Sequence, residues 1–367
     1  MVFSVLIFIA FIALQGCYTV SQGYHQAKLL LTSESIEQIL AEKSETPERL
    51  ERLKWVPQIL EYAREKVGLE TGSSYTRYIR LDGEAVTWVV QAAEKRKLQR
   101  KTWWFPLVGS QPYLGFFAKK DALTLQEQLK REGYDTRVGG VSAFSLLGYL
   151  PDPLYSSMID SQSLADIVDV IIHECTHRTL YLPNASTFNE SFADFVAKKA
   201  TVQFLNELGN SNALDSAGTE IAAYTERYQA ELRAGPLFKS FLANVMKRLE
   251  EFYAAAENDL TLQDEAAFLA ARTAKFKEIE LDFDREVRGA AKGSWYEHAF
   301  KADRLNNAVV LAYSLYEAKA EPFEQAYLHA GQDLAKLINN LKICLADDKD
   351  LDEELLWKSV SQCKSGE

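Results

Sequence analysis

Two histidines four residues apart, His173 and His177, are the side chains of this sequence whose type and spacing could do chemistry. On a helix they are turned about 40° from each other and lie one turn apart, so both rings can reach a single metal ion. Such a site needs a third protein ligand and an open position for water. A carboxylate on the next helix is a usual ligand, and Glu190 is placed to supply it. The spacing therefore predicts a Zn²⁺ ion held by His173, His177 and Glu190.

Glu174, between the two histidines, completes the pattern His-Glu-x-x-His that is typical of zinc peptidases. Zinc lowers the pKa of a bound water toward about 7. The carboxylate of Glu174 can then take the proton of that water as general base and return it to the leaving amine. Asp194 lies one turn beyond Glu190 and could accept the outer N–H of a liganding histidine, with Asn189 in the same supporting layer.

The alternative is that two surface histidines are spaced this way by chance, since a bare His-Glu-x-x-His pattern occurs in many sequences. A capped helix, a Glu that opens the next helix and an Asp one turn later favour the metal site. The remaining histidines, His25, His298 and His329, have no partner at a metal-ligand spacing and are interpreted as ordinary surface or core residues.

The helix that carries the histidines is predicted to begin at Ser163, because Asp166 three residues later completes a capping box. One apolar stripe, including Cys175, anchors this helix, so Cys175 is interpreted as a buried thiol and not as a ligand. The opposite side presents the histidines. A second helix is predicted from about Thr187 to Leu208, with Glu190 in its first turn and Gly209 at its end.

The other elements predict an α+β, zincin-like fold. A helix after Thr46-Pro47, with a kink at Pro57, precedes a region rich in aromatic and β-branched residues. Strands are expected at 75–79, 85–92, 102–107, 113–117 and 136–147, with a helix at 121–131. Helical patterns follow at 215–233, 236–257, 261–287, 300–319 and 322–345. We expect an N-terminal lobe at 18–160 with a small mixed or antiparallel sheet, a larger helical lobe at 161–367 that carries the zinc site, and the active-site helix at their junction.

Residues 1–17 are predicted to be a signal peptide, because Val2 to Leu14 are almost wholly apolar but too few to span a bilayer. The segment ends in Leu14-Gln15-Gly16-Cys17, which resembles a bacterial lipobox, so Cys17 is the expected lipidation site. The alternative is an ordinary cleaved signal with a chance cysteine. No Asp follows Cys17, which by resemblance to bacterial sorting indicates a periplasm-facing lipoprotein of the outer membrane in the cell envelope, anchored by its N-terminal lipid.

Charge and cysteine content exclude some classes of protein and leave one pairing open. The formal net charge of -11 and the pI of about 5.2 argue against nucleic acid as a partner, since phosphate binding needs a concentrated basic face. Cys344 and Cys363 are close enough to form a disulfide in an oxidising compartment, but they could equally be two unpaired thiols. The sequence leaves the oligomeric state open.

Nearly all of the chain resembles the bacterial putative aminopeptidase family, exported zinc proteins of the gluzincin type. The motifs that carry the resemblance are Lys101-Thr102-Trp103, Pro112-Tyr113-Leu114-Gly115-Phe116-Phe117, Val138-Gly139-Gly140-Val141-Ser142-Ala143-Phe144-Ser145, His173 to His177, Phe188-Asn189-Glu190-Ser191-Phe192-Ala193, and Leu305-Asn306-Asn307-Ala308 with Tyr316. The resemblance implies His173, His177 and Glu190 as ligands and Glu174 as base. By analogy with gluzincins, the strand from Gly139 to Ser145 is the sheet edge to which a peptide adds. Tyr316 is the candidate oxyanion donor, and a helix-packing tyrosine is the alternative.

Two functions from different classes remain. The first is a membrane-anchored zinc peptidase, of aminopeptidase type, acting on peptides or proteins in the cell envelope. The second is a lipoprotein with the same fold that serves binding or chaperoning. Glu174 favours the first, because a binding protein needs no base beside its metal.

Overall fold

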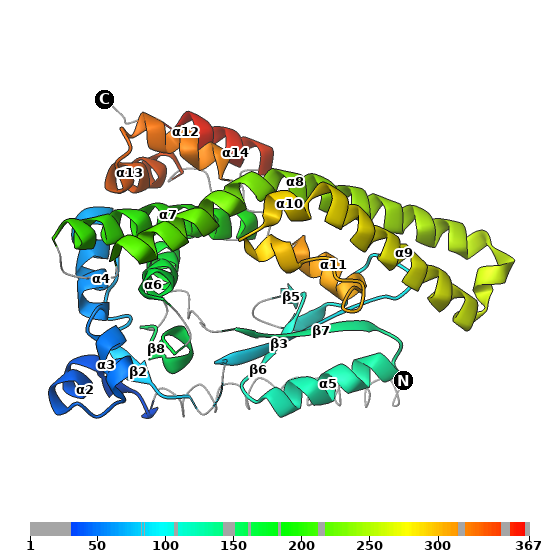
Figure 1. The fold of residues 1–367 in the computed structure, drawn as a ribbon, viewed down its shortest axis with the longest axis horizontal. Coiled ribbons are helices and arrows are strands. Elements are labelled where there is room, and N and C mark those ends of the chain that lie inside the picture. The colour runs from blue at the N-terminus through cyan, green and yellow to red at the C-terminus, as the bar shows by residue number, and fades with distance from the viewer. Residues whose placement is uncertain are drawn as a thin grey trace, which may run out of the picture.

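The structure is a computed structural model that describes residues 31–81, 83, 85–105, 109–141, 151–160, 163–182, 185–211, 217–314, 320–345 and 353–363. The predicted signal segment with Cys17, the residue Tyr316 and positions 142–145 of the proposed edge strand lie outside this set. The chain is a mixed α+β protein, mostly helical with small sheets (Figure 1). None of the described helices is long and apolar enough to cross a membrane.

The sheet nearest the long helices has β3 (Thr87–Ala93) at its centre. β6 (Leu114–Phe116) and β7 (Asp135–Val141) pair antiparallel with its two sides. Helix α5 (Lys119–Arg131) covers one face, where Ala122 and Leu129 pack with Val90 and Ala92. These elements confirm the strands predicted near 85–92, 113–117 and, as far as residue 141, 136–147.

Two further sheets are smaller. β4 (Trp103–Phe105) pairs antiparallel with β5 (Gly109–Gln111), a strand that the sequence did not predict. β2 (Arg77–Ile79) lies between β1 (Glu34–Ser35), which is antiparallel to it, and β8 (Leu154–Tyr155), which is parallel.

The N-terminal helices are α2 (Ile36–Glu42), α3 (Pro47–Leu53) and α4 (Val56–Tyr62), followed by a π-helical turn η1 (Ala63–Val67). Thr46 caps α3 as expected, because its hydroxyl accepts from the backbone N–H of Arg49. The predicted kink at Pro57 is instead a break before it. Pro57 stands in the first turn of α4, where its missing N–H would have had no helical partner.

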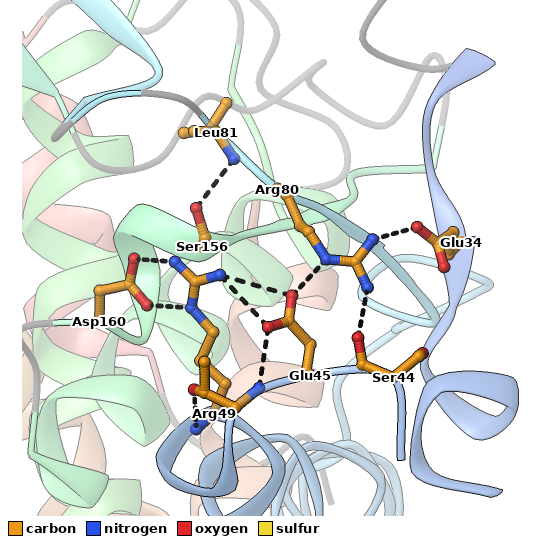
Figure 2. A network of polar contacts seen from close by, with 9 residues as sticks. Glu34, Ser44, Glu45, Arg49, Arg80, Leu81, Ser156 and Asp160 are labelled. Atoms are coloured by element: carbon orange, nitrogen blue, oxygen red, sulfur yellow. Dashed lines mark hydrogen bonds and ion pairs between the residues drawn. The ribbon is translucent and has the colours of Figure 1, made fainter. Parts of the chain in front are cut away.

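A charged network fixes the chain just before the helix that carries His173 and His177 (Figure 2). Arg49 donates from Nε and Nη2 to the two carboxylate oxygens of Asp160 at 2.7 and 2.8 Å. Glu45, whose side chain is only 4% exposed, pairs with both Arg49 and Arg80, and Arg80 also reaches Glu34. A carboxylate this buried destabilises the fold unless cations pair with it. The network ties the short turn η2 (Ser156–Met158) and Asp160 to the N-terminal helices.

Helix α6 (Leu164–Thr179) forms as the sequence predicts. Ser163 caps it, and Ser163 and Asp166 form the capping box. The predicted apolar stripe is buried throughout, and Cys175 is a free thiol, 1% exposed, in the main hydrophobic core. Helix α7 (Ser186–Asn210) packs directly on α6.

Helix α8 (Ala217–Asn258) is one 42-residue element where the sequence predicted two. Pro236 removes one backbone donor but does not end the helix, because packing holds both halves. Tyr224, in the first half, belongs to the core around α6 and α7. Phe238, in the second half, belongs to the core shared with α9 (Glu265–Glu286). The short elements η3 (Leu260–Gln263), α10 (Arg288–Ala291) and η4 (Trp295–His298) complete this part. Helix α11 (Asn307–Tyr313) begins later than the predicted 300, since Asn306 caps it. Residues 315–319 of that predicted helix lie outside the described residues.

The C-terminal helices pack against α7 and lie above it in Figure 1. They are α12 (Glu321–His329), α13 (Leu334–Cys344) and α14 (Glu353–Gln362), and Gly331 at a φ of 69° separates the first two where one helix was predicted. Phe323 of α12 packs against Phe192 of α7 at 5.3 Å between ring centroids.

A disulfide joins Cys344 to Cys363, which answers the pairing that the sequence left open. The lobe boundary near residue 160 stays a prediction.

The disulfide gives a stability prediction. It closes a loop over a sequence separation of 19, and restricting such a loop in the unfolded chain stabilises a protein by about 3 kcal/mol. We expect the double substitution Cys344→Ser and Cys363→Ser to lower the midpoint of thermal unfolding by several degrees. A reducing agent should have the same effect on the parent protein and none on the variant. A parent protein indifferent to reduction would contradict the bridge.

Candidate metal centre

Three side chains from two consecutive helices meet at one point. Nε2 of His173 lies 3.1 Å from Nε2 of His177, both on α6. The carboxylate of Glu190, on α7, places Oε2 3.5 Å from Nε2 of His173 and Oε1 3.6 Å from Nε2 of His177. The structure therefore brings together the three residues that the sequence predicted as ligands.

These separations fit a metal ion. Ligand atoms about 2.1 Å from a tetrahedral ion lie about 3.4 Å from one another. Two imidazole nitrogens and one carboxylate are also a donor set that zinc uses when one position stays open. The group of His173, His177 and Glu190 could thus hold a metal ion. The Glu190 side chain is 51% exposed and that of His177 only 7%, so the centre is enclosed on the α6 side and open at Glu190.

The packing of α7 explains why Glu190 faces the histidines. Phe188 and Phe192 are buried in the main core, and Glu190 lies about 160–200° round the helix from both of them. Asn189 fixes the connection between the two helices. Its side-chain amide donates to Leu182 O and its oxygen accepts from Leu182 N–H, both at 2.8 Å. Asn189 therefore supports the centre through the backbone and not through a histidine.

Asp194 lies one turn after Glu190, on the far side of the His173 ring. Its Oδ1 is 3.6 Å from Nδ1 of His173, so the residue predicted to contact the outer nitrogen of a liganding histidine lies next to His173; its role in orienting the ring stays a prediction. Nδ1 of His177 has no hydrogen-bond partner among the described residues.

The charges around the centre set which group carries a proton when no metal is bound. Burial lowers the pKa of His173, but the carboxylates of Asp194 and Glu190 outweigh it and raise that pKa to about 10. For His177, burial and the charge of His173 lower the pKa to about 4. Burial raises the pKa of Glu190 and the histidines lower it, with a net lowering. The metal-free centre thus holds one proton, on His173, at neutral pH.

Sequence reasoning missed three residues that surround these groups. Asp169 lies one turn before His173 on α6, and burial raises its pKa to about 6. Lys198 lies one turn after Asp194, and Glu231 comes from α8. The spacing of four residues could have indicated Asp169 and Lys198, but Glu231 approaches from a distant segment and left no local signal.

The fold and the centre together define a mixed α+β protein with a His-Glu-x-x-His helix and a candidate His-His-Glu metal group. The His-Glu-x-x-His pattern on a helix is one that many metallopeptidases use to hold their metal. The family model described as "Putative aminopeptidase" matches residues 17–355, and the chain belongs to that family. Comparisons with curated proteins and with solved structures found no match.

The protonation of the metal-free centre predicts how metal affinity depends on pH. Zinc must displace the proton from His173, while His177 carries none near neutrality. Between pH 6 and pH 8, below the pKa of His173, each unit of falling pH should weaken zinc binding by about tenfold. Competition with a chelator of known pH dependence measures this slope. A dissociation constant that stays flat over this range would contradict the assignment of the proton to His173.

Proposed function

We propose that this protein is a zinc-dependent peptidase of aminopeptidase type that hydrolyses peptide bonds with Glu174 as general base. The observation that carries the proposal is the convergence of His173, His177 and Glu190 at separations that suit a tetrahedral ion. Membership of the aminopeptidase family supports the reaction class.

Glu174 is the proposed acceptor of the proton of the attacking water. On α6 it lies about 100° round the helix from His173 and about 60° from His177, so it stands at the flank of both candidate ligands. Its negative charge is among those that raise the pKa of His173. Zinc bound at the centre would supply Lewis acidity that makes a water reactive near neutral pH. Glu174 would take the proton of the attacking water and deliver it to the nitrogen of the leaving amine.

The substrate peptide is proposed to pair with β7, in a zincin-like arrangement. β7 is an end strand of its sheet, because β3 lies between it and β6. Gly139 and Gly140 fall within it, and a Cβ on Gly140 would lie 2.9 Å from Cβ of Ala85, so glycine is needed there for close packing. Main-chain hydrogen bonds to such a strand would orient a peptide without selecting its sequence. Tyr316 stays the proposed oxyanion donor.

The place of action is proposed to be the bacterial cell envelope. The apolar segment up to Leu14 and the lipobox-like Leu14-Gln15-Gly16-Cys17 support export and lipidation of Cys17. The disulfide between Cys344 and Cys363 supports an oxidising compartment such as the periplasm. The proposed substrates are therefore peptides or proteins of the envelope.

The substitution Glu174→Gln tests the mechanism. The amide cannot accept the proton of the attacking water, so we expect kcat for peptide hydrolysis to fall by about 10²–10⁴-fold. Zinc content should stay at the level of the parent protein, because Glu174 is not a proposed ligand. Metal analysis and a peptide assay measure the two quantities. Glu61→Gln, on the exposed side of α4, is the matched control and should leave both unchanged. Equal activity of Glu174→Gln and parent protein would reject the mechanism.

Blocked substrates test the aminopeptidase label. An aminopeptidase holds the free α-amine of its substrate. Acetylation of the peptide N-terminus should therefore reduce kcat/KM by about 10²-fold or more, because the group of the enzyme that binds the amine is left without its charged partner. An endopeptidase should cleave both forms at similar rates. Cleavage of paired free and acetylated peptides, followed by mass spectrometry, distinguishes them by rate and by the bond cut.

A further inference from the structure

A row of charged side chains continues from the metal centre to a third helix. Asp194 directs Oδ1 to Nδ1 of His173 at 3.6 Å and Oδ2 to Nζ of Lys198 at 3.0 Å. The same Nζ lies 3.0 Å from Oε2 of Glu231. Asp194 and Lys198 belong to α7 and Glu231 to α8, so one ammonium group links both helices to a candidate ligand.

The two oxygens of Asp194 have separate partners. Because a carboxylate is planar and rigid, a contact that fixes Oδ2 also sets where Oδ1 points. Lys198 is itself fixed from its other side by Glu231, whose side chain is 16% exposed, while that of Lys198 is 21% exposed. Asp194 is the most exposed of the three at 40%, and it is the one whose orientation needs a second contact.

We propose that Lys198, held by Glu231, is a positioning residue of the metal centre: it fixes Asp194 so that Oδ1 meets Nδ1 of His173 and Nε2 of His173 stays aimed at the metal. The inference rests on the proposed zinc-dependent function. Contacts to the outer nitrogen of a liganding histidine fix the orientation of its ring and raise its basicity, and their loss weakens metal binding by about 10–100-fold.

Simple charge repulsion predicts the opposite change in zinc affinity when Lys198 is removed. A lysine close to a zinc site repels the cation, so on this basis its removal should tighten zinc binding. If Lys198 instead orients Asp194, removal of Lys198 weakens zinc binding. The sign of the change therefore separates the two roles of Lys198.

The test measures the zinc dissociation constant of the full-length protein by competition with a chromogenic chelator. Lys198→Met should weaken zinc binding by about tenfold or more. Lys198→Arg keeps a cation that can contact both carboxylates, and should restore most of the affinity. The matched control is Lys199→Met. Lys199 is the next residue, its side chain is 25% exposed, and it pairs with Glu324 at 3.0 Å, so its loss should leave zinc binding unchanged.

A second pair of variants tests whether Lys198 acts through Asp194. In an Asp194→Asn background the further change Lys198→Met should have no effect on zinc affinity, whereas independent action would make the two losses add. If Lys198→Met alone does not fold, the double change Lys198→Met and Glu231→Gln removes the ion pair as a unit and should show the same loss of affinity. A melting curve of the metal-free protein reports folding separately.

The outcomes distinguish this inference from the proposed function. If the parent protein binds no zinc, the proposed function fails and the inference fails with it. If the parent protein binds zinc and Lys198→Met binds it equally or more tightly, only the inference is overturned. Additive losses in the Asp194→Asn background would also overturn it.

Discussion

The packing of α6 against α7 is the contact on which the rest of this structure depends. The buried side of α6, with Val168, Ile172 and Cys175, and the buried side of α7, with Phe188 and Phe192, belong to one hydrophobic core. Once those sides are joined, the polar residues of both helices must emerge next to each other. Burial of apolar surface, which has no direction of its own, thus brings the polar ends of three side chains to separations of 3.1, 3.5 and 3.6 Å.

The remaining elements hold this pair of helices from outside. The ion pair between Arg49 and Asp160 fixes the segment that enters α6, and Asn189 clamps the backbone that leaves it. The C-terminal helices cover the rear of α7, where Phe323 packs against Phe192. α8 packs against both α6 and α7 and brings Glu231 to Lys198. The centre is therefore fixed from several sides, while the Glu190 side chain is 51% exposed.

The sequence predicted the candidate site better than it predicted the fold. His173 and His177 could be placed from helical geometry alone, because a spacing of four residues and a capping box at Ser163 are local signals. Glu190 was predicted from its place in the first turn of the next helix, and only the packing of α7 on α6 brings it to the histidines. The break before Pro57 and the continuity of α8 through Pro236 were not predictable in this way. A proline only removes one donor, and whether a helix stops there depends on what the two halves pack against. Glu231 was missed for the same reason, since only the tertiary fold brings it to α7.

The charges near the centre bear on how a substrate could be held. Asp194 is engaged by His173 and Lys198, Glu231 by Lys198, and Asp166 by Arg227. A peptide whose free α-amine needed one of these carboxylates would have to displace a cation that the protein already supplies. The proposed pairing with β7 involves no such exchange, because main-chain hydrogen bonds along an end strand add to a peptide whether or not its N-terminus is free. Since Asp194, Glu231 and Asp166 are already paired with cations, an aminopeptidase of this fold would have to hold the free α-amine of its substrate with a carboxylate other than these three.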